Sequence, residues 1–256
     1  MRRLFHHDRP GLPANWQDIL TARSGLWRLL DADEQARLGV LAEDLLATKR
    51  WEAARDFELT DEVRTVIAAH AALLALELDS ASYDGVGTIV VRAGAMRRVA
   101  PMAGPVAGVV ADVGAVDGEA HHGDGPVMVT WSSARREAAN PRLGRDVVLH
   151  EFAHKLDMRD GVSDGTPLID DEALRERWIE VCTTEYENVR AGNSVLRPYA
   201  GTNAAEFFAV ASETFFTQPR DVESLKPDLY DVLRAFYGQD PAARIRTRIA
   251  EATTPN

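Results

Sequence analysis

The sequence predicts an α+β fold: a mostly helical single domain with a small sheet. Apolar residues recur with helical spacing at about 15–30, 33–57 and 60–78. Between 83 and 133 the pattern changes to short β-branched runs separated by glycine, and helical periodicity returns from 144 onward. Helices, then strands, then helices again are typical of the α+β class.

The predicted elements follow in chain order. Residues 1–13 carry two prolines and a histidine pair, and we expect a flexible tail there. One domain then spans 14–256, since no linker interrupts it: a helical part at 14–80, the small sheet at 83–133 and later helices within 144–251. Thr60, followed by Glu62 and an apolar run, predicts a helix start.

Three runs predict strands: TIVVRAG (88–94), GPVAGVVADV (104–113) and GPVMVTWSS (125–133). The segment VMVTW (127–131) fits either an edge strand that pairs with an extended substrate or an ordinary core strand. Later helices are expected at 144–158, 169–191, 203–217, 226–237 and 241–251.

Composition excludes several classes. The chain has 256 residues, is 45% hydrophobic and carries a net charge of −11, which argues against direct binding of nucleic acid or of an anionic membrane. No run of about 18 apolar residues exists, so no transmembrane helix is expected. The N-terminal residues lack the apolar segment of a signal peptide, and Cys182 is the only cysteine. We therefore expect a cytoplasmic protein.

The segment DVVLHEFAHKLDMRDG (146–161) contains the pattern His-Glu-x-x-His. Positions four apart lie one turn apart on a helix, so His150 and His154 can bind one zinc ion, with Glu151 placed to act on its water. The neighbouring residues are apolar, so two histidines and a glutamate on this helix need a partner. The alternatives are core histidines satisfied by hydrogen bonds and a zinc site that serves only stability.

A catalytic zinc site has three protein ligands, so a third must come from elsewhere. Asp160 is one option, and Asp157, one turn after His154, is suited to hydrogen bonding instead. The remaining histidine candidates are His70, His121 and His122, of which the last two lie in a Gly-rich, loop-like stretch.

The segment RPYAGTNAAEFFAVASETFF (197–216) offers better candidates. Glu206 and Glu213 are seven residues apart, on one face of an otherwise apolar helix. Glu206 as the ligand, with Glu213 accepting a hydrogen bond from a ligand histidine, is the first assignment, and the swapped roles are the second. Alternatively, Glu206 belongs to a capping box with Asn203, and Glu213 is an exposed acid at the polar edge of the helix.

Four blocks give the chain a family resemblance: FELTDEVRTVIAAHAALL (57–74), GPVMVTWSSA (125–134), VVLHEFAHKLDMRDG (147–161) and YAGTNAAEFFAVASETFF (199–216). In these blocks and their order the chain resembles the Mlc titration factor A family of bacterial zinc metallopeptidases. The resemblance implies zinc ligands at His150, His154 and Glu206, and Glu151 as the catalytic base. It also implies a catalytic role for Tyr199, seven residues before Glu206.

The same arrangement recurs in anthrax lethal factor, so the resemblance implies a zincin-like metallopeptidase core. One departure is Ala204, where family members often have proline; proline would suit the first turn of a helix, so this change should matter little.

The resemblance implies peptide hydrolysis, of aminopeptidase type on short peptides, by a zinc-activated water with Glu151 as general base and Tyr199 near the developing oxyanion. The rival function is regulatory: the family is named for sequestering Mlc, a transcriptional repressor, which would then be the partner while peptidase activity is secondary.

Overall fold

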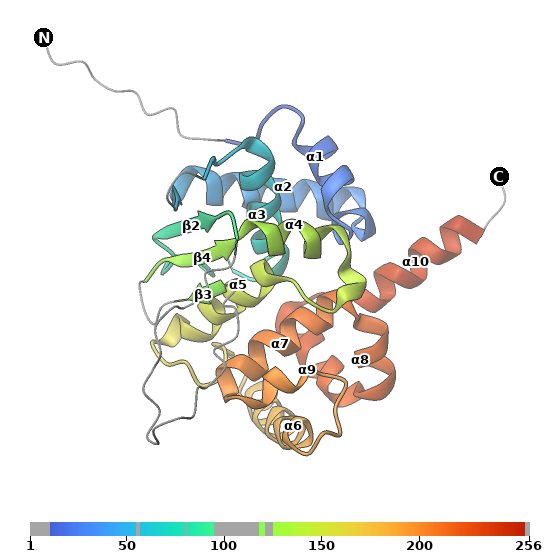
Figure 1. Cartoon of the computed structure of the whole chain (residues 1–256). Helices are drawn as coiled ribbons and strands as arrows, with labels where there is room; N and C mark the ends of the chain where they lie inside the picture. The colour runs from blue at the N-terminus through green and yellow to red at the C-terminus, as the bar shows by residue number, and fades with distance from the viewer. Residues whose placement is uncertain (1–10, 55–56, 80, 95–117, 121–124, 254–256) are drawn as a thin grey trace, which may run out of the picture.

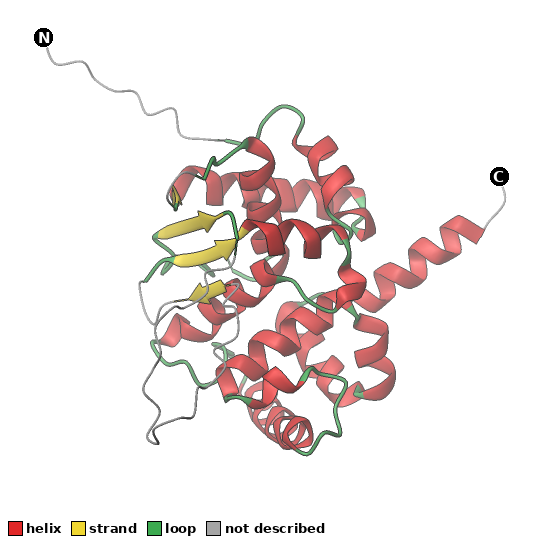
Figure 2. Cartoon of the chain, viewed as in Figure 1, coloured by secondary structure: helices red, strands yellow, loops and turns green. Residues whose placement is uncertain are grey.

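The computed structural model describes residues 11–54, 57–79, 81–94, 118–120 and 125–253. Most of these residues lie in helices, with a small sheet to one side (Figure 1, Figure 2). The predicted mostly helical α+β chain is confirmed to this extent. The strand expected at 104–113 and residues 1–10 of the expected tail lie outside the described residues.

The first three helices are α1 (Trp16–Arg23), α2 (Ala32–Thr48) and α3 (Asp61–Leu74), with a short 3₁₀ turn, η1 (Trp27–Leu29), after α1. A capping box starts α2, because the Asp31 side chain accepts from the Glu34 N–H and the Glu34 side chain accepts in return. Thr60 caps α3 as predicted, by accepting from the Val63 N–H. Nearly all of α3 is buried, which makes it a core element of this part of the chain.

The sheet has the strand order β1-β2-β4-β3. Strands β1 (Arg50–Ala53), β2 (Thr88–Arg92) and β4 (Val127–Thr130) are parallel, and β3 (Gly118–Ala120) runs antiparallel to β4. The predicted helix over 33–57 was wrong beyond Thr48, because the chain leaves α2 there and pairs with β2. Parallel neighbours require a crossover connection, and α3 lies within the one between β1 and β2.

Strand β4 pairs with β2 on one side and with β3 on the other. Of the two interpretations of 127–131, the edge strand is therefore wrong and the internal strand is confirmed. The predicted strand was also too long, because the backbone turns into a helix, α4 (Trp131–Ala139), directly after Thr130. This helix was not predicted, since the apolar run of the strand continues into Trp131.

The rest of the chain is helical. After the turn η2 (Pro141–Leu143) come α5 (Val147–Asp157), η3 (Met158–Asp160), α6 (Glu172–Arg190), η4 (Pro198–Gly201), α7 (Ala204–Thr217), α8 (Pro219–Leu225), α9 (Pro227–Tyr237) and α10 (Pro241–Thr253). The short helix α8 was not predicted. Proline occupies the first position of α8, α9 and α10, where its missing N–H costs no hydrogen bond.

Helix α5 is the central element. It packs against α3, α7, β3 and β4, and Figure 1 shows helices α1–α4 and the sheet on one side of it and α6–α9 on the other. Helix α10 projects away from the remaining helices (Figure 1). Because α5 lies between these two groups of helices, a polar side chain on it is enclosed by both.

Within the described residues, none of the helices combines the length and apolar character needed to cross a bilayer.

Candidate metal centre on helices α5 and α7

Helix α5 carries the His-Glu-x-x-His pattern. Every residue from Val147 to Asp157 is buried, so all sides of the helix meet other parts of the chain. Asp146 caps its start by accepting from the Val148 and Leu149 N–H groups at 3.0 and 3.1 Å. One turn separates His150 from His154, and their rings meet edge to face with centroids 4.8 Å apart.

Helix α7 supplies the two glutamates. Asn203 caps it by accepting from the Glu206 N–H at 2.9 Å, so one half of the expected capping interaction is present. That bond uses the backbone of Glu206 and leaves its carboxylate to face α5. Glu213 lies two turns further on and is 1% exposed, so the alternative of an exposed acid was wrong.

Three side chains converge where α5 and α7 meet: His150, His154 and Glu206, whose donor atoms all lie within 4.8 Å of one another. The two Nε2 atoms are 3.2 Å apart, and Glu206 Oε2 is 3.1 Å from His150 Nε2 and 3.6 Å from His154 Nε2. Tetrahedral zinc with bonds of about 2.0–2.1 Å requires donors separated by about 3.3–3.5 Å. The spacing of this cluster therefore fits one zinc ion.

The chemistry of the donors fits as well. Among the described residues, Glu206 Oε2 is buried without a hydrogen-bond partner, although two ring nitrogens lie near it. Two imidazole nitrogens that face each other repel unless a proton or a metal ion lies between them. A cation would satisfy all three atoms at once.

The far side of the His150 ring is held firmly. Its Nδ1 lies 2.6 Å from Glu213 Oε1. Arg197 donates to both oxygens of Glu213, at 3.0 and 2.5 Å, and the Asp146 N–H donates to Glu213 Oε2 at 2.9 Å. The carboxylate of Glu213 is thus fully engaged, and it fixes both the tautomer and the orientation of His150.

Two further residues border the cluster. Glu151 is 3% exposed, whereas Tyr199, in η4, is 49% exposed and its ring centroid lies 6.2 Å from that of His150. Burial and the charge of Glu206 raise the pKa of the Tyr199 hydroxyl to about 12. The hydroxyl therefore keeps its proton at neutral pH and can donate a hydrogen bond.

Electrostatics differ between the two histidines. Burial alone would lower the pKa of His150, but the charge of Glu213 and the nearby Glu206 and Glu151 carboxylates outweigh it and raise that pKa to about 10. Burial lowers the pKa of His154. Burial also opposes ionisation of Glu206, yet its contacts with both imidazoles keep its pKa below the usual value. In the metal-free cluster an ionised carboxylate therefore lies beside one protonated and one neutral imidazole, and a divalent cation would take the place of the His150 proton between these donors.

The other sequence candidates lie elsewhere. The hydrogen bonds described for Asp157 join it to Ser163 and to the backbone of Gly165, not to the cluster. Asp160 is exposed and accepts from the Val162 N–H. His70 hydrogen-bonds Asp146, and His121 and His122 lie outside the described residues.

Two residues next to the cluster were not predicted. Asp146 could have been recognised, because an aspartate directly before an apolar helical run is a common helix cap. Arg197 carried no such signal, since nothing in the sequence shows that it meets an acid 16 residues away.

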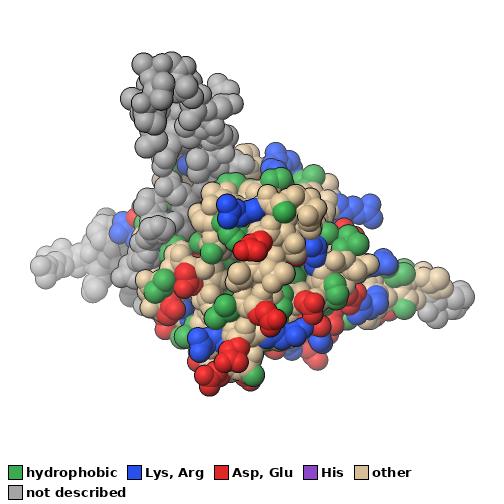
Figure 3. Space-filling model, turned by 90° about the horizontal axis from the view of Figure 1, so that it is seen from below, with side chains coloured by type: hydrophobic (Ala, Val, Ile, Leu, Met, Phe, Trp, Pro, Cys, Tyr) green, Lys and Arg blue, Asp and Glu red, His purple; other side chains and the backbone are tan. Residues whose placement is uncertain are grey.

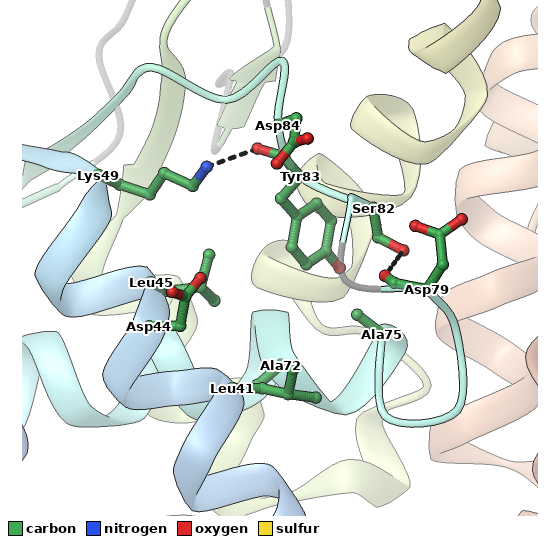
Figure 4. A pocket seen from close by; sticks show the side chains of 10 residues that line it. All are labelled: Leu41, Asp44, Leu45, Lys49, Ala72, Ala75, Asp79, Ser82, Tyr83 and Asp84. Carbon is green, nitrogen blue, oxygen red and sulfur yellow. Dashed lines mark hydrogen bonds between the residues drawn. The ribbon is translucent and has the colours of Figure 1, made fainter.

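A hollow away from the cluster lies between α2, the end of α3, Asp79 and residues 82–84 (Figure 4). Its volume is about 30 Å³, room for about one water molecule. Lys49 Nζ donates to the Tyr83 carbonyl oxygen and Ser82 Oγ to the Asp79 carbonyl oxygen, both at 2.7 Å. The close-up shows these groups paired with one another, so nothing there indicates a ligand (Figure 4).

The face seen in Figure 3 shows acidic, basic and apolar side chains interspersed, without a continuous basic patch. On that face, nothing suggests a nucleic-acid surface.

Comparison with known proteins gives a consistent result. The model of the family described as "Glucose-regulated metallo-peptidase M90" matches residues 1–238. Protein slr2042 of Synechocystis sp. is 35% identical over 246 residues, which cover 94% of this chain and 88% of that protein. Mlc titration factor A of Serratia proteamaculans is 32% identical over 267 residues (96% and 95%). Mlc titration factor A of Pectobacterium atrosepticum is 31% identical over 225 residues (85% and 84%).

The resemblance inferred from the four sequence blocks is thereby confirmed. The chain belongs to the glucose-regulated metallo-peptidase M90 family.

Proposed function

We propose that the chain is a zinc-dependent metallopeptidase that acts as an aminopeptidase on short peptides. The observation that carries the proposal is the convergence of His150, His154 and Glu206 at separations that fit one tetrahedral zinc ion. Membership of a metallo-peptidase family supports the same reaction class. Within the described residues this cluster has three protein donors, whereas a purely structural zinc site has four.

The roles follow from position. His150, His154 and Glu206 would hold the ion, and Glu213 keeps the His150 ring turned toward it. When bound, zinc supplies a Lewis acid that lowers the pKa of water to about 7 and polarises a carbonyl oxygen. Glu151 takes one proton from the attacking water and delivers it to the amine that leaves as the peptide C–N bond breaks. The Tyr199 hydroxyl donates a hydrogen bond to the oxyanion that develops on the substrate carbonyl.

The test compares wild type with Glu151→Gln. Both proteins should bind one zinc ion per chain by elemental analysis, and the variant should lose hydrolysis of aminoacyl and peptide chromogenic substrates by at least about a hundredfold. Asp160→Asn removes an exposed acid near the end of α5 and should keep full activity. Equal rates in wild type and Glu151→Gln would show that Glu151 is not the base, and absence of zinc from wild type would refute the metal site.

The name of two of these relatives, Mlc titration factor A, favours a second role: binding of a repressor like Mlc. A repressor that co-purifies with this chain and stays bound to Glu151→Gln would support that role. A repressor that fails to bind either protein would refute it.

A further inference from the structure

The start of helix α5 is held by an unusual set of buried carboxylates. Four consecutive backbone N–H groups, at 146–149, each donate to a carboxylate oxygen. Glu213 accepts from residue 146, Glu137 accepts from residue 147 at 2.9 Å, and Asp146 itself accepts from the next two. At most helix starts, such N–H groups donate to water or to a single capping side chain. At the start of α5, three carboxylates hold them instead.

Asp146 extends the network in the other direction. Its Oδ1 caps the helix, and its Oδ2 lies 2.6 Å from Nδ1 of His70, on α3. Nε2 of His70 lies 2.9 Å from Oγ of Ser24, which follows α1 and also accepts from the Trp27 N–H at 3.1 Å. Because that N–H already donates to Ser24 Oγ, the hydroxyl hydrogen is available to His70 Nε2, and His70 Nδ1–H donates to Asp146.

These three residues have the composition of a serine-hydrolase triad, but they cannot work as one. Ser24 is 2% exposed, His70 is 2% exposed and Asp146 is 1% exposed, so no substrate reaches the hydroxyl. The other carboxylate oxygen of Asp146, Oδ1, accepts from the backbone of α5, so both oxygens of this side chain are paired. A buried, fully paired chain of this kind fixes geometry rather than reacting.

Asp146 is linked to the metal cluster by two routes. Its carbonyl oxygen accepts the His150 N–H at 3.0 Å, which fixes the backbone of that ligand. Its own N–H donates to Glu213, which in turn holds the His150 ring. A shift of Asp146 would therefore move the His150 ring relative to the other two donors.

We propose that His70, supported by Ser24, is a positioning residue for the metal centre: it holds Asp146 in place and thereby aligns His150. The inference rests on the proposed zinc site. Removal of the His70 donor would leave a buried oxygen of Asp146 unpaired, and the start of α5 would rearrange to satisfy it. Partners one step removed from a metal ligand change metal affinity by about 10–100-fold when lost.

The experiment measures the zinc dissociation constant of the full chain by competition with a chelator. His70→Leu removes both hydrogen bonds. His70→Asn keeps a donor at the position of Nδ1, facing Asp146, and His70→Gln instead keeps one at the position of Nε2, facing Ser24. Thr65→Val is the matched control, because Thr65 is buried on the same helix and has no hydrogen-bond partner among the described residues.

The expected result is that His70→Leu and His70→Gln bind zinc about 10–100-fold more weakly. His70→Asn and Thr65→Val should stay within about threefold of wild type. Should His70→Leu not fold, His70→Gln takes its place, because it keeps a polar side chain but no donor facing Asp146, and it should still weaken zinc binding by about 10–100-fold. Thermal unfolding of the metal-free proteins is the second measurement. If His70 were purely structural, the variants would differ in unfolding temperature but not in zinc dissociation constant.

Two results would overturn the inference. If His70→Leu, or in its place His70→Gln, binds zinc as tightly as wild type, His70 does not position the site. If His70→Asn loses as much affinity as His70→Leu, the contact with Asp146 is not the cause. A wild-type chain that binds no zinc would instead refute the proposed function itself, and the two failures are therefore distinguishable.

Discussion

The first and third turns of α7 each present a glutamate to His150, but in opposite environments. Glu206, in the first turn, has an 18% exposed side chain and an oxygen directed at two ring nitrogens with no hydrogen bond to satisfy it. Glu213, in the third turn, is almost fully buried, and Arg197, His150 and a backbone N–H occupy its oxygens. Spacing places the two acids on one face of α7, while their surroundings decide which carboxylate keeps an unpaired oxygen for the proposed zinc ion.

The largest expected effect comes from Glu206→Gln. If this carboxylate is a metal ligand, the variant should lose zinc affinity by more than the 10–100-fold typical of residues one step further from the metal. The metal-free variant should lose less stability than Glu213→Gln, because Glu206 contacts only the two imidazoles, whereas Glu213 also binds Arg197 and a backbone N–H. Chelator competition and thermal unfolding measure the two quantities, and wild-type zinc affinity would refute the ligand assignment.

The complementary change, Glu213→Gln, should act first on stability. It leaves the Arg197 guanidinium and the His150 ring without their charged partner in a buried site, which typically costs about 3–5 kcal/mol. The metal-free protein should therefore unfold about 10 °C earlier, at roughly 2–4 °C per kcal/mol for a chain of this size. If the metal-free Glu213→Gln and Glu206→Gln proteins unfold at the same temperature, the proposed difference between the two glutamates is wrong.

Tyr199→Phe tests the partly exposed side of the same cluster. Since the hydroxyl pKa is about 12, the group is a neutral donor, and its loss should lower the rate of hydrolysis by about a hundredfold with zinc affinity unchanged. Steady-state kinetics with a chromogenic peptide measures the effect. A variant with full activity would show that Tyr199 only packs beside the helix.

Asp157→Asn extends the contrast to a buried acid whose described hydrogen bonds come from Ser163 and the backbone of Gly165. Burial raises the pKa of Asp157 to about 7, so its folded-state pKa lies above the unfolded one of about 4. As the pH rises above about 4, Asp157 ionises in the unfolded chain but stays protonated in the folded one. Wild type therefore loses stability between about pH 4 and pH 7, and the loss levels off above that. The Asn variant should therefore gain stability relative to wild type between pH 5 and 8, on the order of 2 kcal/mol.

Thermal unfolding at pH 5 and pH 8 measures that difference. Asp160→Asn is the control, since Asp160 is exposed and should show no such trend. An Asp157→Asn profile parallel to that of wild type would show that Asp157 is ionised in the folded protein throughout this range.

Local pattern was enough for much of the fold. The cap at Thr60 and the apolar face around His150 and His154 are encoded within one or two helical turns, and the helices there appear where expected. The segment at Trp51 has helical periodicity in the sequence but forms a strand, because it pairs with Ile89, 38 residues away. Contacts between distant parts of the chain decide the structure of such segments, and the local apolar pattern carries no information about those contacts.

The candidate site divides in the same way. The candidates His150, Glu151 and His154 follow from spacing on one helix. Spacing alone allows either order of roles for Glu206 and Glu213, and Glu206 as the ligand is the first assignment and the one that the family resemblance implies. Contacts such as Arg197 with Glu213, or His70 with Asp146 across 76 residues, depend on how the helices pack. The sequence could supply the candidates, and only the packing of α5 on α7 distinguishes their environments.

The most direct test of the central claim is an anomalous-difference map at the zinc absorption edge, from crystals of the zinc-loaded full chain. The account predicts one peak about 2.0–2.2 Å from Nε2 of His150, Nε2 of His154 and a carboxylate oxygen of Glu206. Glu213 should remain on Nδ1 of His150, away from the metal. A peak coordinated by Glu213 in place of Glu206, or no peak between α5 and α7, would contradict it.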